Sequence, residues 1–368
     1  MPRKFVHRGE GYGKGIAMTP RERVIRTLRF EPVDRAPRDL WHLPGVALLR
    51  KDELDAMLAR FPLDFAPPEF KAGQGARTRG TPDRVGSYTD EWGCTWSVAE
   101  DGVVGEVKAC PLADWAALPG FSPPWEVLEG ADFSKTNASC AATDRFVRGG
   151  TAVRLFERMQ FLRGVENLYM DLACLPPELY LLRDMVHEYY LHEIEHWAAT
   201  DVDAVFFMDD WGAQHNLLIA PDLWRALFKP CYAAYCTRIK AAGKFVFFHS
   251  DGYIEPIIED LIEIGVDAIN SQLFCMDIEA LAARFGGRIT FWGEICRQQV
   301  LPFGSPTEVR RAVQRVRRAF DSGAGGVIAQ CEWGNNDPAE NIAAVFESWL
   351  EPRDAIQPAG LGKNSAST

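Results

Sequence analysis

A histidine and an aspartate, two residues apart, follow an apolar run in the middle of the chain. The segment reads Phe-Phe-His-Ser-Asp-Gly over residues 247–252. Side chains at positions i and i+2 of a β-strand point to the same face, so we expect His249 and Asp251 to project together. This pair predicts a metal site or an acid/base site at the end of a strand.

Cys331 is a possible third member of this site, because it ends another short apolar run over residues 325–331. It is too far from His249 in the sequence for a local zinc knuckle. A (β/α)8 barrel gathers the C-terminal ends of several distant strands around one axis, and its catalytic residues lie there. We therefore expect His249, Asp251 and Cys331 to converge at the mouth of such a barrel and to bind a metal.

Two further carboxylates also follow apolar runs. Glu294 comes after residues 289–293, and Asp210 is the second residue of an acidic pair after residues 204–208. Either could be a fourth ligand, give a proton to a leaving group, or fix the tautomer of His249. We take Glu294 and Asp210 as candidate catalytic residues, with Glu294 the stronger candidate. The alternative is that such acids are helix caps.

Each candidate ligand also has a plain structural interpretation. His249 could be a buried, hydrogen-bonded histidine, Asp251 a turn residue before a glycine, and Cys331 a small core residue. Three aromatic side chains near these positions are candidates for the pocket wall, although aromatic residues are commonly core: Trp292, Trp333 and Phe274.

An alternation of short apolar strands with helices of about ten residues or more runs from residue 150 onward. It is typical of parallel βα units, and the fold class it predicts is an α/β TIM barrel. We expect strands at residues 151–158, 204–208, 244–249, 267–272, 288–294 and 325–331, and helices at residues 177–199, 221–242, 255–264, 277–285, 306–322 and 338–350.

The N-terminal part of the chain lacks this alternation. A threonine N-cap before a proline predicts a helix from residue 19 to about residue 28, and residues 36–41 suit the first barrel strand. Short strands and turns at about residues 80–130 predict an inserted lobe over the barrel mouth. We expect a single barrel domain at residues 19–352, with a flexible arm at 1–18 and a disordered tail at 353–368.

Composition excludes several classes of protein. The chain has 368 residues and a net charge of −11, which disfavours a nucleic-acid surface because phosphate binding needs clustered Lys and Arg. No apolar stretch approaches the roughly 20 residues that span a bilayer, and we expect neither a membrane segment nor a signal peptide. The nine cysteines have no CxxC pair. They suggest free thiols in a reducing cytoplasm.

A zinc-protease pattern, HExxH, is present at residues 192–196. On a helix it would place two histidines on one face for zinc. Here it lies near the C-terminal end of a helix that leads into the strand at 204–208. That end of a barrel helix lies opposite the catalytic face, so we interpret the pattern as a chance match on a solvated helix face.

Several sequence blocks together resemble the uroporphyrinogen decarboxylase superfamily, over about residues 19–350. The resemblance implies a (β/α)8 barrel. The blocks are Arg35-Ala36-Pro37, FMDDWGAQHNLLIAPDLWRALFKPCY, FVFFHSDGYIEPIIEDLIEIGVDAINSQ, ITFWGEI, LPFGSPTEVRRAV and CEWGNNDPAENIAA.

Two branches of that superfamily differ in chemistry. The true decarboxylases use no metal and carry an Arg-Gln-Ala-Gly-Arg-Tyr segment, whereas residues 38–45 here read RDLWHLPG and lack the paired arginine and tyrosine. The corrinoid-dependent methyltransferases bind zinc through His-x-Cys-Gly and a distant cysteine. This chain is similar to them at His249 and Cys331, with Asp251 in place of the first cysteine.

A carboxylate in place of a thiolate is a harder ligand, which leaves zinc a stronger Lewis acid. This suits polarising an ether or hydroxyl oxygen so that a methyl group can leave. The alternative is that the substitution means weak metal binding or none.

The resemblance implies a zinc-dependent methyltransferase that moves a methyl group between a small methoxylated or methylated substrate and a corrinoid protein. The sequence contains no DxHxxG corrinoid-binding motif, so the cobalamin is expected on a separate partner protein. One alternative is a metal-free decarboxylase or lyase acting on a carboxylated, tetrapyrrole-like compound. Another is a non-catalytic protein that binds a small ligand in the barrel.

Overall fold

Eight parallel strands form a nearly closed barrel in the structure, a computed structural model that describes residues 18–356. Their spatial order is β1-β11-β10-β9-β8-β7-β6-β2, which is the chain order of a (β/α)8 barrel. The strands are β1 (Arg38–His42), β2 (Phe65–Ala66), β6 (Phe146–Gly150), β7 (Ala204–Met208), β8 (Phe245–Ser250), β9 (Ala268–Ser271), β10 (Thr290–Trp292) and β11 (Val327–Trp333).

Asp64 closes the barrel between β1 and β2, which form no ladder with each other. Its backbone N–H donates to the Arg38 carbonyl at 2.9 Å, and its carboxylate accepts from the Arg38 N–H at 2.6 Å. Arg23 and Arg35 hold the same buried carboxylate at 2.6 Å each. The first two strands are therefore joined by one backbone hydrogen bond and by contacts of the Asp64 side chain rather than by a continuous ladder.

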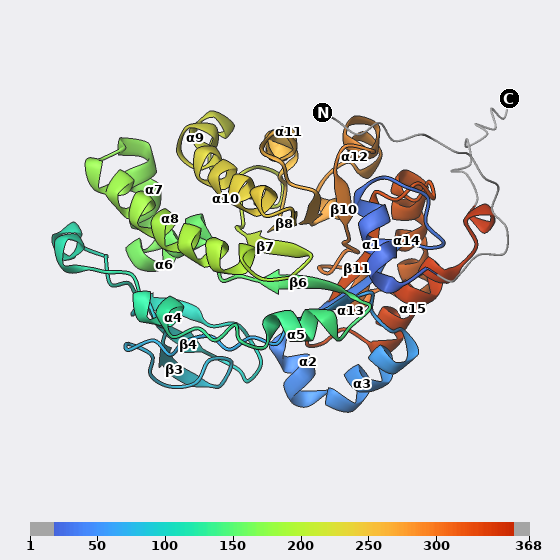
Figure 1. Cartoon of the computed structure of the whole chain (residues 1–368), viewed down its shortest axis with the longest axis horizontal. Coiled ribbons are helices and arrows are strands. Elements are labelled where there is room, and N and C mark those ends of the chain that lie inside the picture. The colour runs from blue at the N-terminus through green and yellow to red at the C-terminus, as the bar shows by residue number, and fades with distance from the viewer. Residues whose placement is uncertain (1–17, 357–368) are drawn as a thin grey trace, which may run out of the picture.

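Helices surround the barrel strands (Figure 1). α1 (Pro20–Leu28) and α14 (Pro306–Phe320) both begin with a capping box and a proline at the first turn. The others that follow barrel strands are α2 (Pro44–Leu49), α3 (Lys51–Arg60), α6 (Leu155–Arg163), α7 (Val165–Cys174), α8 (Pro177–Ala198), α9 (Pro221–Leu227), α10 (Lys229–Ala241), α11 (Glu255–Ile264), α12 (Ile278–Phe285), α13 (Val300–Phe303) and α15 (Ala339–Leu350).

The core has two parts, because successive side chains of each strand point to opposite faces. One part fills the barrel, with Phe146, Phe247, Trp292 and Ile328 among its members. The other lies between the strands and the surrounding helices. This alternation decides which strand residues can reach the barrel mouth.

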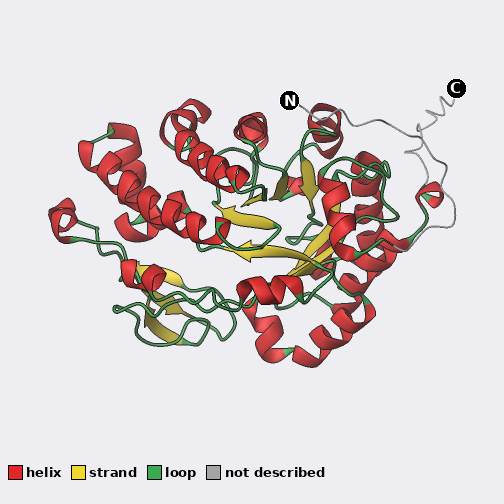
Figure 2. Ribbon diagram, in the orientation of Figure 1, coloured by secondary structure: helices red, strands yellow, loops and turns green. Residues whose placement is uncertain are grey.

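A small antiparallel sheet lies apart from the barrel strands (Figure 2). It consists of β3 (Gly86–Thr89), β4 (Thr95–Val98) and β5 (Glu106–Ala109), and helices α4 (Trp125–Glu129) and α5 (Thr136–Ala141) follow it. It is anchored to α6 by an ion pair of 2.8 Å between Asp90 and Arg158. The carbonyl of Gly102 accepts from the side chain of Asn335, beyond the end of β11, at 2.9 Å. The insertion therefore reaches the edge of the barrel mouth.

Several expectations differ from the structure. The strand expected at residues 151–158 is instead β6, at Phe146–Gly150, and α6 begins at Leu155. The paired glycines disguise this strand, yet Gly149 is needed because a Cβ there would meet the Trp197 ring at 2.7 Å. The helix expected at residues 221–242 is broken at Phe228 into α9 and α10, and β11 lies two residues later than expected.

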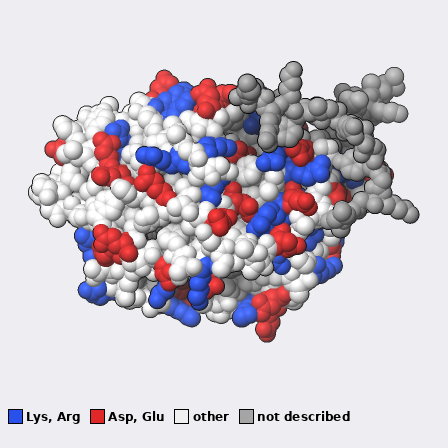
Figure 3. Space-filling model, viewed as in Figure 1, with Lys and Arg blue, Asp and Glu red and all other residues white. Residues whose placement is uncertain are grey.

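The ends of the chain fall partly outside the described residues. The predicted arm lies outside them, except for Met18, and so do residues 357–368 of the predicted tail. Arg353 begins a short 3-10 helix, η3 (Arg353–Ala355), and its Nε donates to Asp321 at 2.7 Å. Among the described helices, none is both long and apolar enough for a membrane span. Basic and acidic side chains are interspersed on the face in Figure 3.

Candidate metal centre

The loops that follow β7 and β8 are pressed together at the barrel mouth. Gly252 has a φ of 76°, and a Cβ on it would meet the Gly212 carbonyl oxygen at 2.1 Å. The Gly212 N–H donates to the Asp251 carbonyl at 3.0 Å, and the Asp251 N–H donates to Oδ1 of Asp210 at 2.9 Å. Two glycines therefore allow the carboxylates of Asp210 and Asp251 to approach the same point.

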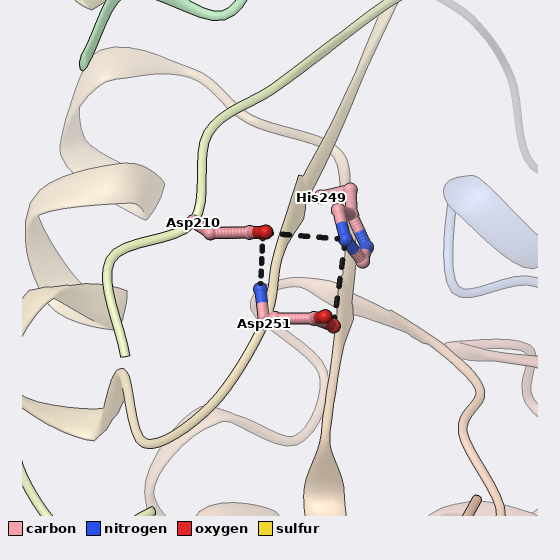
Figure 4. Close-up of side chains that lie close together, drawn as sticks. All are labelled: Asp210, His249 and Asp251. Atoms are coloured by element: carbon pink, nitrogen blue, oxygen red, sulfur yellow. Dashed lines mark hydrogen bonds and ion pairs between the residues drawn. The ribbon is translucent and has the colours of Figure 1, made fainter. Parts of the chain in front are cut away.

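His249 completes this group from the end of β8 (Figure 4). Its Nε2 lies 3.5 Å from Oδ1 of Asp210 and 3.5 Å from Oδ1 of Asp251. The histidine is buried, and the two aspartates are partly exposed. One ligand atom from each residue lies within 4.8 Å of the others, and in the described part of the chain no other set of His, Cys, Asp and Glu meets this criterion.

Asn270, on β9, orients the imidazole. The Nδ1 atom of His249 lies 2.5 Å from Oδ1 of Asn270. The Asn270 amide nitrogen donates to the Trp292 carbonyl and, at 3.1 Å, to Gln330. The asparagine oxygen must therefore accept a proton from Nδ1, which leaves the lone pair of Nε2 directed at the two carboxylates.

Arg297 binds the outer side of the Asp251 carboxylate and also Glu332, at 2.6 Å. Burial opposes its charge, but Glu294, Asp251 and Glu332 together raise the pKa of Arg297. Burial and the Asp210 charge raise the pKa of Asp251, against the lowering effects of His249 and Arg297. Oδ1 of Asp251 is buried and has no hydrogen-bond partner among the described residues.

Glu294 lies next to this group and is 2% exposed. Burial raises the pKa of Glu294 to about 8, although Arg297 lowers it. Its Oε1 has no hydrogen-bond partner in the described chain. Glu294 and Phe274 line a cavity of about 160 Å³ together with several glutamine side chains. A carboxylic acid that keeps its proton near neutral pH can act as a proton donor.

Glu157, at the start of α6, is an acid that the sequence interpretation did not include. Burial raises its pKa to about 8, with a further contribution from Asp210. No strand-end pattern marks this residue, since it lies within a segment expected to be a strand.

Asp209 and Asp210 have different roles although they are adjacent. Asp209 is fully buried, and its carboxylate accepts from the N–H groups of Phe156 and Glu157 at 2.5 and 2.8 Å and from the Tyr232 hydroxyl at 2.6 Å. It therefore holds the first turn of α6. Of the two carboxylates, only that of Asp210 faces the His249 imidazole.

Cys331 is not part of the group that contains His249 and Asp251. In β11, Ile328 packs inside the barrel, while Ala329, Cys331 and Trp333 pack in the outer core against the helices. The structure therefore separates Cys331 from the two residues with which the sequence grouped it. Burial raises the pKa of the Cys331 thiol well above its usual value.

The three aromatic residues predicted to line the pocket, Trp292, Trp333 and Phe274, do not lie together. Trp292 is a member of the inner barrel core, and its Nε1 donates to Asp39 at 3.0 Å. Trp333 belongs to the outer core, with Arg50 stacked over its ring at 5.0 Å. Of the three predicted aromatics, only Phe274 lines the cavity beside Glu294.

Asn270, Arg297 and Glu332 are site residues that sequence reasoning missed. Asn270 had a signal, because it is a polar residue within the buried run of β9. Ile328 and Glu332 are four residues apart in β11, so they point to the same face of the strand. With the correct bounds for β11, Glu332 would have been predicted to point into the barrel. Arg297 lies in a loop after β10, and nothing in its local sequence marks it.

His192 and His196, of the HExxH pattern, are exposed on α8. The imidazole of His192 packs edge-on against Trp125, and that of His196 packs against Phe133. They are not part of a metal-binding group in the described chain.

A family model described as uroporphyrinogen decarboxylase (URO-D) matches residues 158–351, which include the whole candidate centre. The chain belongs to the uroporphyrinogen decarboxylase family. A comparison with curated proteins found no match to this chain.

Comparison with solved structures finds similar chains at low sequence identity. A methyltransferase from Methanosarcina mazei is 15% identical with a TM-score of 0.68, over 92% of this chain and 99% of that chain. An endo-beta-1,4-xylanase from Gloeophyllum trabeum is 12% identical with a TM-score of 0.45, over 91% of this chain and all of that chain. The first of these supports the barrel architecture of this URO-D family member.

Proposed function

We propose that this URO-D family member is a zinc-dependent methyltransferase that moves a methyl group between a small methoxylated or methylated compound and a separate corrinoid protein. The observation that carries the proposal is the convergence of His249, Asp210 and Asp251. The reaction class comes from the His249-x-Asp251-Gly252 motif, and a structure with the same barrel fold is named as a methyltransferase. We further propose a cytoplasmic location, on the basis of the scattered free cysteines.

The three side chains fit a zinc ion. Two ligands of a tetrahedral zinc, each about 2.1 Å from the metal, are roughly 3.4 Å apart. His249 Nε2 lies 3.5 Å from each aspartate oxygen. The hydrogen bond from Nδ1–H to Asn270 leaves Nε2 free to coordinate a metal. Oδ1 of Asp251 is buried without a hydrogen-bond donor among the described residues, and a bound cation would take the place of that donor.

Bound there by His249, Asp210 and Asp251, zinc would supply Lewis acidity toward a substrate oxygen. The chain's own residues do the remaining work. Asn270 fixes the imidazole, and Arg297 holds the far side of Asp251. Glu294 retains a proton at neutral pH. A reduced corrinoid on a partner protein would supply the electron pair that accepts the methyl group. The donor oxygen would then keep the pair of the broken carbon–oxygen bond and take the proton of Glu294.

Charge around the centre disfavours the alternative of a metal-free decarboxylase for a polycarboxylate. Even with Glu157 and Glu294 protonated, the three carboxylates of Asp210, Asp251 and Glu332 remain around the centre. Arg297 is already paired with Asp251 and Glu332. A cation fits this surplus of carboxylates better than a polyanion does.

Metal analysis of the protein purified without added metal tests the proposal directly. We expect about one zinc per chain, and loss of the zinc in His249→Ala. Incubation with a reduced corrinoid protein and a panel of methoxylated donors should then change the corrinoid absorbance with the wild type only. Absence of zinc, together with loss of carbon dioxide from a porphyrinogen at equal rates in both proteins, would favour the decarboxylase alternative.

A further inference from the structure

Arg148 is an arginine inside the barrel whose charge is poorly compensated. It lies on β6, and its guanidinium carbon is 4.4 Å from the Trp292 ring centre, 5.0 Å from Phe206, 5.7 Å from Trp41 and 5.9 Å from Phe65. Four aromatic rings therefore fix its orientation, as cation–π contacts do. Its side chain is 20% exposed, so the guanidinium faces open space on one side.

Asp39 is the polar partner of Arg148 in the described chain, and the contact is long. Nη1 of Arg148 lies 3.5 Å from Oδ2 of Asp39. Asp39 accepts shorter bonds from other groups, at 3.0 Å from the Leu40 N–H and at 3.0 Å from Trp292 Nε1. Most of the five N–H donors of Arg148 have no acceptor among the described residues. Burial lowers the pKa of Arg148, although Asp39 opposes this effect.

The open side of Arg148 faces a cavity of about 580 Å³ at the barrel mouth. The ends of three strands contribute to the cavity, at His42 of β1, Ala66 of β2 and Gly150 of β6. Its walls are mainly apolar and aromatic, and include Trp41, Phe65, Phe70 and Trp197. Such a lining around one charged group is typical of a small-molecule site.

Trp41 connects this cavity to the candidate metal centre. Its ring lines the cavity and lies 5.2 Å from the imidazole of His249, measured between ring centres. It also lies 5.7 Å from the guanidinium carbon of Arg148. A single bound molecule can therefore contact both Arg148 and the region of His249.

We infer that this cavity is the substrate site and that the substrate is an aromatic monocarboxylate, with its carboxylate on Arg148 and its ring against Trp41 and Phe65. The inference rests on the proposed function for the reaction, but the binding it describes does not. Bidentate pairing with an arginine is the usual way to hold a carboxylate. The aromatic walls exclude water, which strengthens that pairing.

Calorimetric titration with benzoate, benzamide and acetate tests the inference. Benzoate carries the charge and the ring, benzamide only the ring, and acetate only the charge. We expect benzoate to bind the wild type at least about tenfold more tightly than either of the others, because only benzoate can pair with Arg148 and also pack a ring against Trp41 and Phe65. In Arg148→Gln the affinity for benzoate should fall to that for benzamide. Equal affinities in the wild type would overturn the inference.

Three further variants keep the test decisive. Arg148→Gln leaves Asp39 buried without its cation, so the double variant Arg148→Gln/Asp39→Asn provides a folded protein if the single variant fails. Arg154→Gln removes another arginine, which does not line the cavity, and should not change benzoate binding. His249→Ala should retain benzoate binding, and loss of binding there would mean that benzoate occupies the metal centre.

The outcomes separate this inference from the proposed function. Benzoate binding that depends on Arg148, without methyl transfer from methoxybenzoates, would support the site and contradict the reaction. Methyl transfer from neutral donors alone, at a rate unchanged in Arg148→Gln, would support the reaction and contradict the site.

Discussion

The Nδ1 atom of His249 lies 2.5 Å from Oδ1 of Asn270, whose amide nitrogen is committed to the Trp292 carbonyl and Gln330. The imidazole is thus held in one tautomer before any ligand arrives. Because four strands, β8, β9, β10 and β11, share this chain of contacts, the direction of Nε2 is a property of the barrel itself.

Asn270→Leu should weaken zinc retention about 10- to 100-fold, because an unsupported imidazole is a poorer ligand. Competition against a graded series of chelators measures this change. Asn270→Asp is the matched control, since it keeps an acceptor for Nδ1–H and should lose much less. Equal retention in the leucine variant would mean that His249 is not a ligand.

Asp210→Ala and Cys331→Ala distinguish the ligand set in the structure from the one suggested by the motif. We expect Asp210→Ala to lose stoichiometric zinc, because Asp210 faces His249 Nε2. Cys331→Ala should keep the metal and lose about 1 kcal/mol of stability from a small cavity in the outer core. Metal analysis and urea unfolding of both variants decide this. The reverse result would restore Cys331 as the ligand.

Asp209→Ala should lower stability by about 2–4 kcal/mol, because it leaves the buried N–H groups of Phe156 and Glu157 and the Tyr232 hydroxyl without an acceptor. Thermal unfolding measures the loss, and Asp209→Asn, which keeps one acceptor oxygen, should lose less. A stable Asp209→Ala protein that had lost only activity would instead assign Asp209 to the chemistry.

Glu193, half-buried on α8, should make stability depend on pH. Burial raises its pKa to about 7, and the bond from the Ala152 N–H opposes this shift. Since the folded-state pKa exceeds the ordinary value of 4.5, the contribution of the protonated acid is complete below pH 4.5 and is lost as the pH rises through 7.

Glu193→Gln removes this dependence and keeps the acceptor for Ala152. The Tm of the variant relative to the wild type should therefore increase between pH 5 and pH 8. Glu188→Gln, an exposed position on the same helix, is the control and should give a flat difference. A flat difference for Glu193→Gln as well would show that the acid is solvated.

The double variant His192→Ala/His196→Ala should leave the zinc content unchanged, because both imidazoles lie against aromatic rings on the surface of α8. Elemental analysis of the purified variant checks this. A drop in zinc of one equivalent would show that the HExxH pattern binds metal after all.

Sequence patterns predicted the barrel because its strands are short apolar runs between longer helices. The β7 strand and α11 were predicted with their observed bounds, and the shared face of His249 and Asp251 follows from strand geometry alone. The β6 strand was missed because Gly149 and Gly150 resemble a turn. Gly149 is required by the packing of Trp197, a tertiary contact that sequence periodicity does not report.

The ligand set was harder to predict than the barrel, for two physical reasons. A shift of two residues in the bounds of β11 made Cys331 a strand end, whereas the strand continues to Trp333. The approach of Asp210 to Asp251 depends on two loops in backbone contact, and such tertiary contact leaves no local signal except the glycines at 212 and 252.

The backbone contact between Gly212 and Gly252 makes the two mouth loops a single mechanical unit. Lengthening, shortening or exchanging one loop alone would move its carboxylate away from the carboxylate of the other loop. Redesign of this centre for another metal must therefore transplant both loops together. Substitutions at the strand ends around Arg148, by contrast, can alter the proposed substrate site without moving these two loops.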